Sequence, residues 1–155
     1  MRRKDREITD INEIISVMEK CDCCRTAFFD DEFPYIVPMN FGMSYENNNI
    51  VLYFHCAAVG KKIDLIKSNP NVSFEMDCSH KLITGPVACD YSMEFESVVG
   101  TGVASFVMDN KIEALNYIMR KHSDADRFTY NEKYLKAVTI FKIDVKSITG
   151  KRKLK

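Results

Sequence analysis

The chain has 155 residues, 46% of them hydrophobic and 28% charged, and its formal net charge is zero because 22 Lys and Arg balance 22 Asp and Glu. This length and composition predict a single soluble globular domain over residues 1–155 with a substantial core. The balanced charge argues against a nucleic-acid partner, and no apolar run approaches the roughly 18 residues that a membrane span needs.

The N-terminal residues are charged and lead directly into mixed polar sequence, without the apolar core of a secretory signal. We therefore expect a cytoplasmic protein whose six cysteines are thiols. Cys21, Cys23 and Cys24 lie close together, but their spacing fits no zinc pattern and no second ligand pair is near them in sequence. No metal site is expected there.

The first elements are a helix followed by strands. Residues 9–20 predict an amphipathic helix capped by Thr9 or Asp10, and residues 24–29 predict a strand that ends in an acidic turn at 30–32. Residues 34–46 read as one long extended segment. Pro38 in that segment donates no backbone hydrogen bond, which indicates a sheet edge or an opening in the pairing.

A hairpin turn at Asn47-Asn48-Asn49 leads into a strand over residues 50–55. A short helix is then expected over residues 59–69, with Val59, Ile63 and Ile66 on one face, ended by Pro70.

Lys61 and Lys62 stand in the first turn of that helix, where each cation opposes the helix dipole by roughly 0.3–1 kcal/mol. A bound anion would remove this conflict, because free N–H groups, the dipole and both ammonium groups would then converge on it. The stretch therefore predicts either a phosphate site or two solvated lysines on a surface helix.

The second half of the chain predicts mostly long strands. Gly100 and Gly102 indicate a bend or a close backbone approach inside one of them. The expected elements are a strand over 72–78, a loop over 79–90 and a strand over 91–107. A helix follows over 111–122, capped by Asp109, with Ile112, Leu115, Ile118 and Met119 inward. The chain then continues as a polar loop over 123–135, a closing strand over 136–148 and a frayed basic tail over 149–155.

Six or seven strands joined mostly by hairpins, with three helices, predict a mainly β protein: an antiparallel barrel with peripheral helices. No glycine-rich dinucleotide fingerprint or phosphate-binding loop occurs. His55 ends a buried strand just before the predicted anion site and is either a polar group of a ligand pocket or a histidine at the barrel rim. Cys56 adjoins it but points to the opposite face, so a Cys–His catalytic pair is not expected. A bound cofactor is then the simplest source of reactivity.

Three stretches carry a resemblance to a known family. They are Pro34-Tyr35-Ile36-Val37-Pro38-Met39-Asn40-Phe41-Gly42, then Phe54-His55-x-Ala57-x-x-Gly60-Lys61-x-x-Asp64, and Cys89-x-Tyr91-Ser92-Met93-x-Phe95-x-Ser97-Val98-Val99-Gly100-x-Gly102. In order and spacing they resemble the flavin-binding split barrels related to pyridoxamine 5′-phosphate oxidase, in the branch called nitroimidazole-resistance proteins. The resemblance runs from about residue 5 to residue 148.

The resemblance implies a six- to seven-stranded split barrel that forms a homodimer with FMN at the interface, FAD being the alternative. It also implies a set of cofactor-binding residues: the backbone of Val37, Pro38, Met39, Asn40 and Phe41 along the flavin ring, His55 and Cys56 beside the ribityl chain and phosphate, Lys61 and Lys62 on the phosphate, and Ser92, Ser97 and Val98 contributed by the partner subunit. Two positions depart from the family pattern: Glu96 stands where a basic residue is common, and Cys56 where Gly or Ser is common.

The resulting hypothesis is an FMN-dependent oxidoreductase that passes electrons from a reduced nicotinamide or another donor to a small acceptor such as a nitro-aromatic. His55 is the side chain expected to polarise the flavin or the substrate. The alternatives are a non-catalytic flavin store or sensor, and a haem- or deazaflavin-binding relative on the same barrel.

Overall fold

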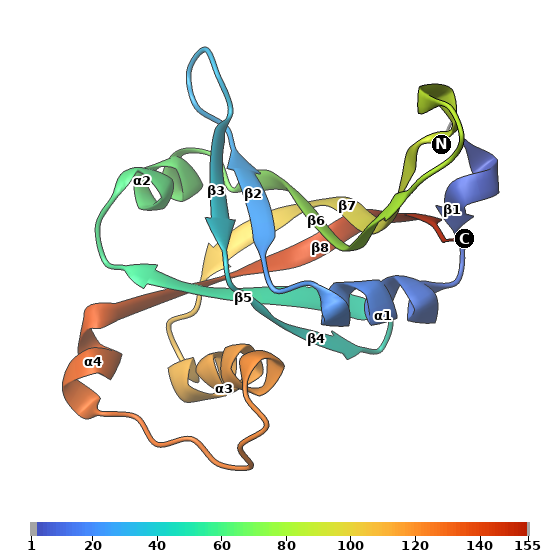
Figure 1. Cartoon of the computed structure of the whole chain (residues 1–155). Coiled ribbons are helices and arrows are strands. Elements are labelled where there is room, and N and C mark those ends of the chain that lie inside the picture. Colours follow the sequence, from blue (N-terminus) through green and yellow to red (C-terminus); the bar gives the residue numbers. More distant parts are fainter. Residues whose placement is uncertain (1–2, 155) are drawn as a thin grey trace.

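A computed structural model describes residues 3–154 and shows one antiparallel sheet curled into a barrel, with helices around it (Figure 1). The strand order is β3-β2-β6-β7-β8-β5-β4, and β1 pairs separately with β8. The strands are β1 (Glu7–Ile8), β2 (Cys24–Phe28), β3 (Tyr35–Met39), β4 (Gly42–Glu46), β5 (Asn49–Ala57), β6 (Asn71–Ile83), β7 (Ser92–Phe106) and β8 (Val138–Lys153). The α-helices are α1 (Ile11–Lys20), α2 (Lys61–Ser68), α3 (Lys111–His122) and α4 (Glu132–Ala137), with short 3-10 turns at Lys4–Arg6 and Ala88–Asp90. Within residues 3–154 no helix combines the length and apolar character needed to cross a membrane.

The barrel is split between β3 and β4. These strands are the two ends of the sheet order, yet only Asn40 and Phe41 separate Met39 from Gly42. Three Cα-to-Cα steps span at most about 11 Å, so the two edges meet at this end without pairing. The prediction of one continuous segment over 34–46 is therefore wrong, because the chain crosses from one edge to the other. The edge position inferred from Pro38 is confirmed, since within residues 3–154 β3 pairs only with β2.

Aromatic side chains fill the barrel. The rings of Phe54 and Phe141 stack at 4.9 Å between centroids, and Phe28 meets Phe141 edge-on at 6.3 Å. All three are buried. Burial of each such side chain contributes about 1.5–3 kcal/mol, so this cluster supplies a large part of the driving force for closure.

α1 closes one end of the barrel, as its sequence pattern predicts. The side chain of Asp10 accepts a hydrogen bond of 2.9 Å from the backbone N–H of Asn12, which confirms the expected cap. Ile14, Val17 and Met18 are buried, and the helix contacts β6, β7 and β8.

Gly100 and Gly102 allow β7 to bend against its neighbours, as the sequence indicates. A Cβ at Gly100 would lie 2.3 Å from Cζ of Phe74, and one at Gly102 would lie 2.5 Å from Cγ2 of Ile143. The pairing of β7 with β8 also shifts register between Thr101 and Gly102. At the other side of the barrel, α3 packs so closely on β4 that a Cβ at Gly42 would lie 2.3 Å from the backbone N of Ile118.

Three predictions about helix ends and faces are wrong. Asn110, at φ 58°, is the N-cap residue of α3 in place of Asp109, because asparagine tolerates the left-handed conformation that the chain adopts there. Ala114 and Ile118 are the buried residues of α3, whereas Ile112 is half exposed. Val59 is 83% exposed because α2 begins only at Lys61.

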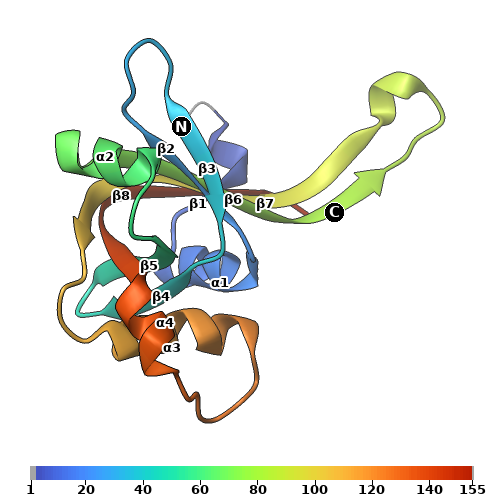
Figure 2. The ribbon, with the colours of Figure 1, turned by 90° about the vertical axis from the view of Figure 1, so that its left-hand side faces the viewer.

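The long strands extend further than their sequences indicate. β6 continues through Ile83, past a left-handed Ser79 and a register shift between Cys78 and Lys81, so the loop predicted over 79–90 is a strand in its first part. The β6–β7 hairpin consequently projects beyond the barrel as an arm (Figure 2). β8 continues through Lys153, so residues 149–153 of the segment predicted as a frayed basic tail pair with residues 95–99 of β7. The polar segment after α3 contains α4, capped by the side chain of Asn131.

Candidate functional site

The split leaves backbone edges unpaired around the start of α2. β4 pairs with β5 only up to Tyr53, so residues 54–57 of β5 continue beyond it and pair only with β8. The outer edge of β3 is likewise unpaired within the described chain. Both β5 and β3 thus expose hydrogen-bonding groups on the side where α2 begins, close to β2 (Figure 1).

Gly60 gives α2 an open N-terminus. Its φ of 139° favours glycine, and it provides no side chain to cap the helix. The N–H groups of Ile63 and Asp64 donate to the carbonyl of Gly60 at 2.9 and 3.3 Å. Those of Lys61 and Lys62 remain as first-turn donors without a helical acceptor. This terminus therefore has the donors and the dipole that bind an anion.

Lys62 lies close to two other residues predicted for the site, Met39 and Cys56. Its Nζ lies 3.6 Å from Sδ of Met39, at the end of β3. Burial raises the pKa of the Cys56 thiol, and the ammonium group of Lys62 opposes that rise. The end of β3, the end of β5 and the start of α2 thus form one site.

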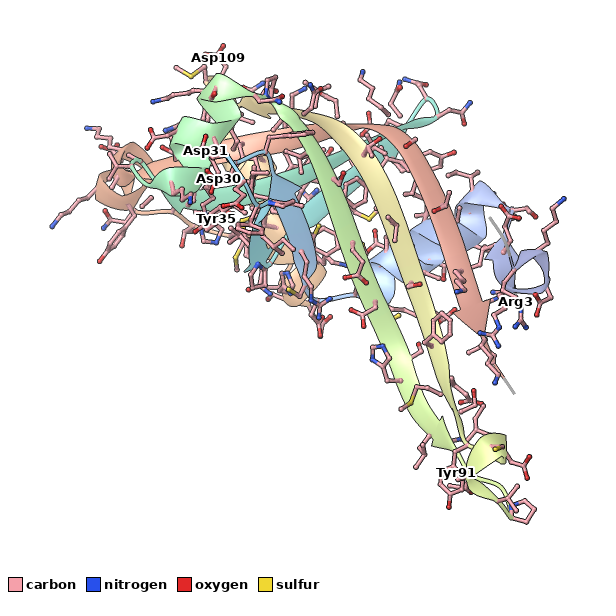
Figure 3. The ribbon with its side chains drawn as sticks, turned by 90° about the horizontal axis from the view of Figure 1, so that it is seen from above. Arg3, Asp30, Asp31, Tyr35, Tyr91 and Asp109 are labelled. Carbon is pink, nitrogen blue, oxygen red and sulfur yellow. The ribbon has the colours of Figure 1, made fainter. Side chains whose placement is uncertain are left out.

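Lys61 points to a different partner. Its Nζ forms an ion pair with the carboxylate of Asp30 and lies 5.0 Å from the centroid of the Tyr35 ring. The hydrogen bond between them raises the pKa of Lys61 and lowers that of Asp30. Figure 3 shows Asp30, Asp31 and Tyr35 gathered beside α2. The sequence predicted only a turn at residues 30–32, and the run of acidic residues there was the one signal of a charged partner for the lysines.

The other residues predicted for the site near the split differ in their exposure and in their contacts. His55 is exposed on β5, and Val37 and Pro38 lie on the edge strand. Phe41 is fully buried, with its ring 6.4 Å from that of Phe54, so its side chain belongs to the core. The side-chain amide of Asn40 donates to the carbonyl of Asp22 at 2.9 Å, which fixes the crossing between the edges.

Ser92, Ser97 and Val98 lie on β7. No hydrogen bond or ion pair among residues 3–154 joins them to Lys61, to Lys62 or to β3. Val98 is fully buried in the core, whereas the hydroxyl of Ser92 accepts a hydrogen bond from Lys153. Any contact of this strand with the site would have to come from a second subunit.

Glu96, one of the two departures from the family pattern, bonds to α1 and β6 and not to the residues of the site. Its carboxylate is 3% exposed and accepts hydrogen bonds of 2.8 Å from Nζ of Lys20 and from the hydroxyl of Ser79. Burial acts to raise the pKa of Glu96, but the bonds from Lys20 and Ser79 outweigh it and the pKa is lowered. Glu96 therefore joins α1 to the base of the β6–β7 arm.

Hollows lie near the site, one at the Asp30 turn and one against α2. One, of about 290 Å³, adjoins the Asp30 side and is lined by Ala27, Phe28, Phe29, Asp30, Asp31, Glu32, Pro34 and Ser73. Another, also of about 290 Å³, is lined by Ala58, Ile63, Lys67, Phe106, Val107, Met108, Lys111, Thr139 and Ile140. The second hollow, lined in part by Ile63 and Lys67 of α2, gives room for a small molecule beside the helix.

The cysteines differ in burial: Cys21 and Cys24 are buried, Cys89 is exposed, and the other three are partly buried. Burial raises the pKa of Cys21 and of Cys24. No three His, Cys, Asp or Glu side chains converge as a metal site within residues 3–154.

Comparisons with known proteins agree with this geometry. The sequence profile of the family described as pyridoxamine 5′-phosphate oxidase matches residues 10–152. A crystal structure of a Bacteroides thetaiotaomicron protein, named for 5-nitroimidazole antibiotic resistance, is 37% identical over 94% of this chain and 86% of its own, with a TM-score of 0.80. None of the curated proteins matches the sequence.

More distant structures share the fold. The flavocytochrome Anf3 of Azotobacter vinelandii is 14% identical over 100% of this chain and 72% of its own, with a TM-score of 0.82. The FAD and heme binding protein of Mycobacterium smegmatis is 12% identical over 97% of this chain and 74% of its own, with a TM-score of 0.83. The split barrel with a unit of β3, β5 and α2 at its opening, and the match over nearly the whole length, lead to one conclusion: this chain belongs to the pyridoxamine 5′-phosphate oxidase family of flavin-binding split barrels.

Proposed function

We propose that the protein is an FMN-dependent oxidoreductase that acts as a homodimer. The observation that carries this proposal is the meeting of the β3 edge, the end of β5 and the open N-terminus of α2 at Lys62, whose Nζ is 3.6 Å from Sδ of Met39. A ligand with a flat, hydrogen-bonding ring at one end and a phosphate at the other matches this combination of strand edge and anion site.

The phosphate end explains the two lysines. A phosphate monoester carries about −1.5 to −2 charges at neutral pH, which offsets cations that otherwise oppose the dipole of α2. Lys61 and Lys62 would hold this group together with the N–H groups that follow Gly60. FMN ends in such a monoester. FAD is the alternative, supported by the FAD-binding protein of Mesorhizobium loti, which shares the fold at a TM-score of 0.64.

The ring end would lie along β3, with the backbone of Val37, Pro38 and Met39 bonding its edge and residues 40 and 41 turning the chain away. When bound, the flavin supplies the electron-transfer chemistry. Among the chain's own residues, exposed His55 at the end of β5 is the one we assign to polarise the flavin or the substrate. Cys56, half-buried beside Lys62, would flank the ribityl chain.

The acceptor we propose is a small nitro-aromatic molecule, and the donor a reduced nicotinamide or another reductant. This step rests on the name of the Bacteroides thetaiotaomicron relative, 37% identical to this chain. Flavins pass electrons to such acceptors while the protein orients the ring and excludes water.

A homodimer would cover the exposed apolar side chains of the arm and of β7. Leu82, Tyr91, Met93 and Val99 are 56%, 52%, 44% and 51% exposed. Apolar side chains grouped on one projecting hairpin mark an interaction surface. In the dimer Ser92 and Ser97 of one subunit would reach the flavin of the other, while buried Val98 would act only by holding the strand.

A visible absorption spectrum of the purified protein tests the proposal. We expect flavin bands that bleach under anaerobic addition of a reduced nicotinamide and return when a nitro-aromatic acceptor is added. A haem or deazaflavin spectrum would refute the cofactor. A flavin spectrum that no reductant of this class bleaches would instead identify a flavin store or sensor.

A further inference from the structure

Asp30 forms a preorganised anion beside the proposed phosphate site. It lies two residues after the end of β2, and its Oδ1 accepts a hydrogen bond of 3.0 Å from the backbone N–H of Asp31. Its side chain is 22% exposed and pairs with Nζ of Lys61. Tyr35 flanks the same ammonium group, 5.0 Å from the ring centroid (Figure 3). The carboxylate thus engages one of the three N–H donors that the Lys61 ammonium group would otherwise offer to a ligand.

The two lysines of α2 are therefore unequal. The charge of Lys61 is matched by Asp30, whose carboxylate raises the pKa of the Lys61 ammonium group through their hydrogen bond. Lys62 contacts the thioether of Met39, and no carboxylate within residues 3–154 lies within ion-pair distance of it. A phosphate arriving at the N-terminus of α2 would meet one uncompensated cation and one that already has an anion.

We propose that Asp30 is an internal competitor of the flavin phosphate, a residue that sets how tightly this site holds a phosphorylated ligand. The inference rests on the proposed function, because it requires the phosphate to bind at Lys61 and Lys62. To bind the phosphate, the ammonium group of Lys61 must either break its ion pair with Asp30 or contact both anions at once. In either case the carboxylate remains near a group that carries about −1.5 to −2 charges and repels it.

Removing only the charge of Asp30 tests this. Asp30→Asn keeps the size of the side chain and an oxygen that can accept the Asp31 N–H. It should tighten FMN binding on the order of tenfold, because the phosphate no longer faces a like charge and Lys61 is free to form a charge-assisted hydrogen bond with it. Riboflavin, which lacks the phosphate, should bind the variant and the parent within about twofold of each other.

Asp31→Asn is the matched control. It makes the same charge change one residue away, on an exposed side chain that forms no ion pair with Lys61. Its effect on FMN binding should be no more than about one third of that of Asp30→Asn, because a solvated charge acts through water. Titration of the parent and of both variants with each of the two flavins, by quenching of flavin fluorescence, gives the comparison.

Adding Lys62→Met to the series separates the claim of a phosphate site from the claim that Asp30 competes with the phosphate. If Lys62→Met weakens FMN but Asp30→Asn has no effect, or the same effect as Asp31→Asn, the phosphate site stands and the competitor role is refuted. If Lys62→Met changes FMN and riboflavin binding alike, no phosphate binds there and the role of Asp30 falls with it. A tighter FMN complex for Asp30→Asn, with riboflavin binding unchanged, supports the inference.

Discussion

Glu96→Gln tests the role of the buried carboxylate that joins α1 to the arm. In the parent, the Glu96 carboxylate lies 2.8 Å from the hydroxyl of Ser79 and 2.8 Å from Nζ of Lys20. Glutamine keeps the shape and can still accept the hydrogen bond from Ser79, but it loses the negative charge that faces Lys20. A hydrogen bond to a charged group is worth about 1.5–3 kcal/mol against about 0.5–1.5 for a neutral one. Because Lys20 is 51% exposed, solvent screens part of this difference, and we expect a loss of about 1 kcal/mol at pH 7.

The loss should depend on pH in one direction. The folded-state pKa of Glu96 is lowered below the ordinary value of 4.5, so its charge stabilises the fold above that value. As the pH falls through the folded-state pKa, both states become protonated and the contribution disappears. Parent and variant should therefore differ at pH 7 and converge toward pH 3.

Thermal unfolding over this pH range measures the effect, and about 1 kcal/mol corresponds to a midpoint shift of roughly 2–4 °C for a chain of this size. Glu13→Gln is the matched control, because its partner Arg152, at 2.7 Å, is 38% exposed and the pair lies in solvent. That variant should stay within about 1 °C of the parent. A Glu96→Gln deficit that is the same at pH 3 and pH 7, or no larger than that of the control, refutes the reasoning.

Three further changes probe other parts of the structure. Gly102→Val should cost about 2 kcal/mol or more in denaturant unfolding, because its Cβ would lie 2.5 Å from Cγ2 of Ile143 and 2.7 Å from the carbonyl oxygen of Asp144; parental stability would contradict the close approach. Val99→Lys, at a side chain 51% exposed on β7, should shift a dimer toward monomer in light scattering, and an unchanged mass would place the interface elsewhere. His55→Ala should retain flavin but alter its reduction or its turnover of a nitro-aromatic, whereas parental rates would reduce His55 to a rim residue.

Local sequence patterns predicted those elements whose backbone geometry is set by residues close together in the sequence. The spacing of apolar residues and an acidic cap define α1, and asparagines that tolerate positive φ, at 50° and 62° for Asn47 and Asn48, define the β4–β5 hairpin. Pro38 marks an edge because a missing N–H excludes it from a central strand. In each case the residue itself imposes the backbone geometry.

Features that depend on a distant partner were not predictable in this way. The basic end of β8 looks like a tail by composition, yet β7 offers it a backbone ladder and the Phe95 ring, 5.6 Å from Nζ of Lys151. β6 passes through a left-handed Ser79 that interrupts the alternation of its side chains. The pairing of Asp30 with Lys61 arises only when β2 and α2 pack together. No spacing rule links those positions.

The measurement that tests the central claim most directly is titration of the flavin-free protein with FMN and with riboflavin, in the parent, Lys62→Met and Lys67→Met. Lys67 is a matched control, an exposed lysine in the last turn of the same helix. If the N-terminus of α2 holds a flavin phosphate, Lys62→Met should weaken FMN binding roughly ten- to a hundredfold, leave riboflavin binding unchanged, and have no counterpart in Lys67→Met. Equal affinity of parent and Lys62→Met for FMN, or an equal loss for both flavins, would contradict the phosphate site on which the proposed function depends.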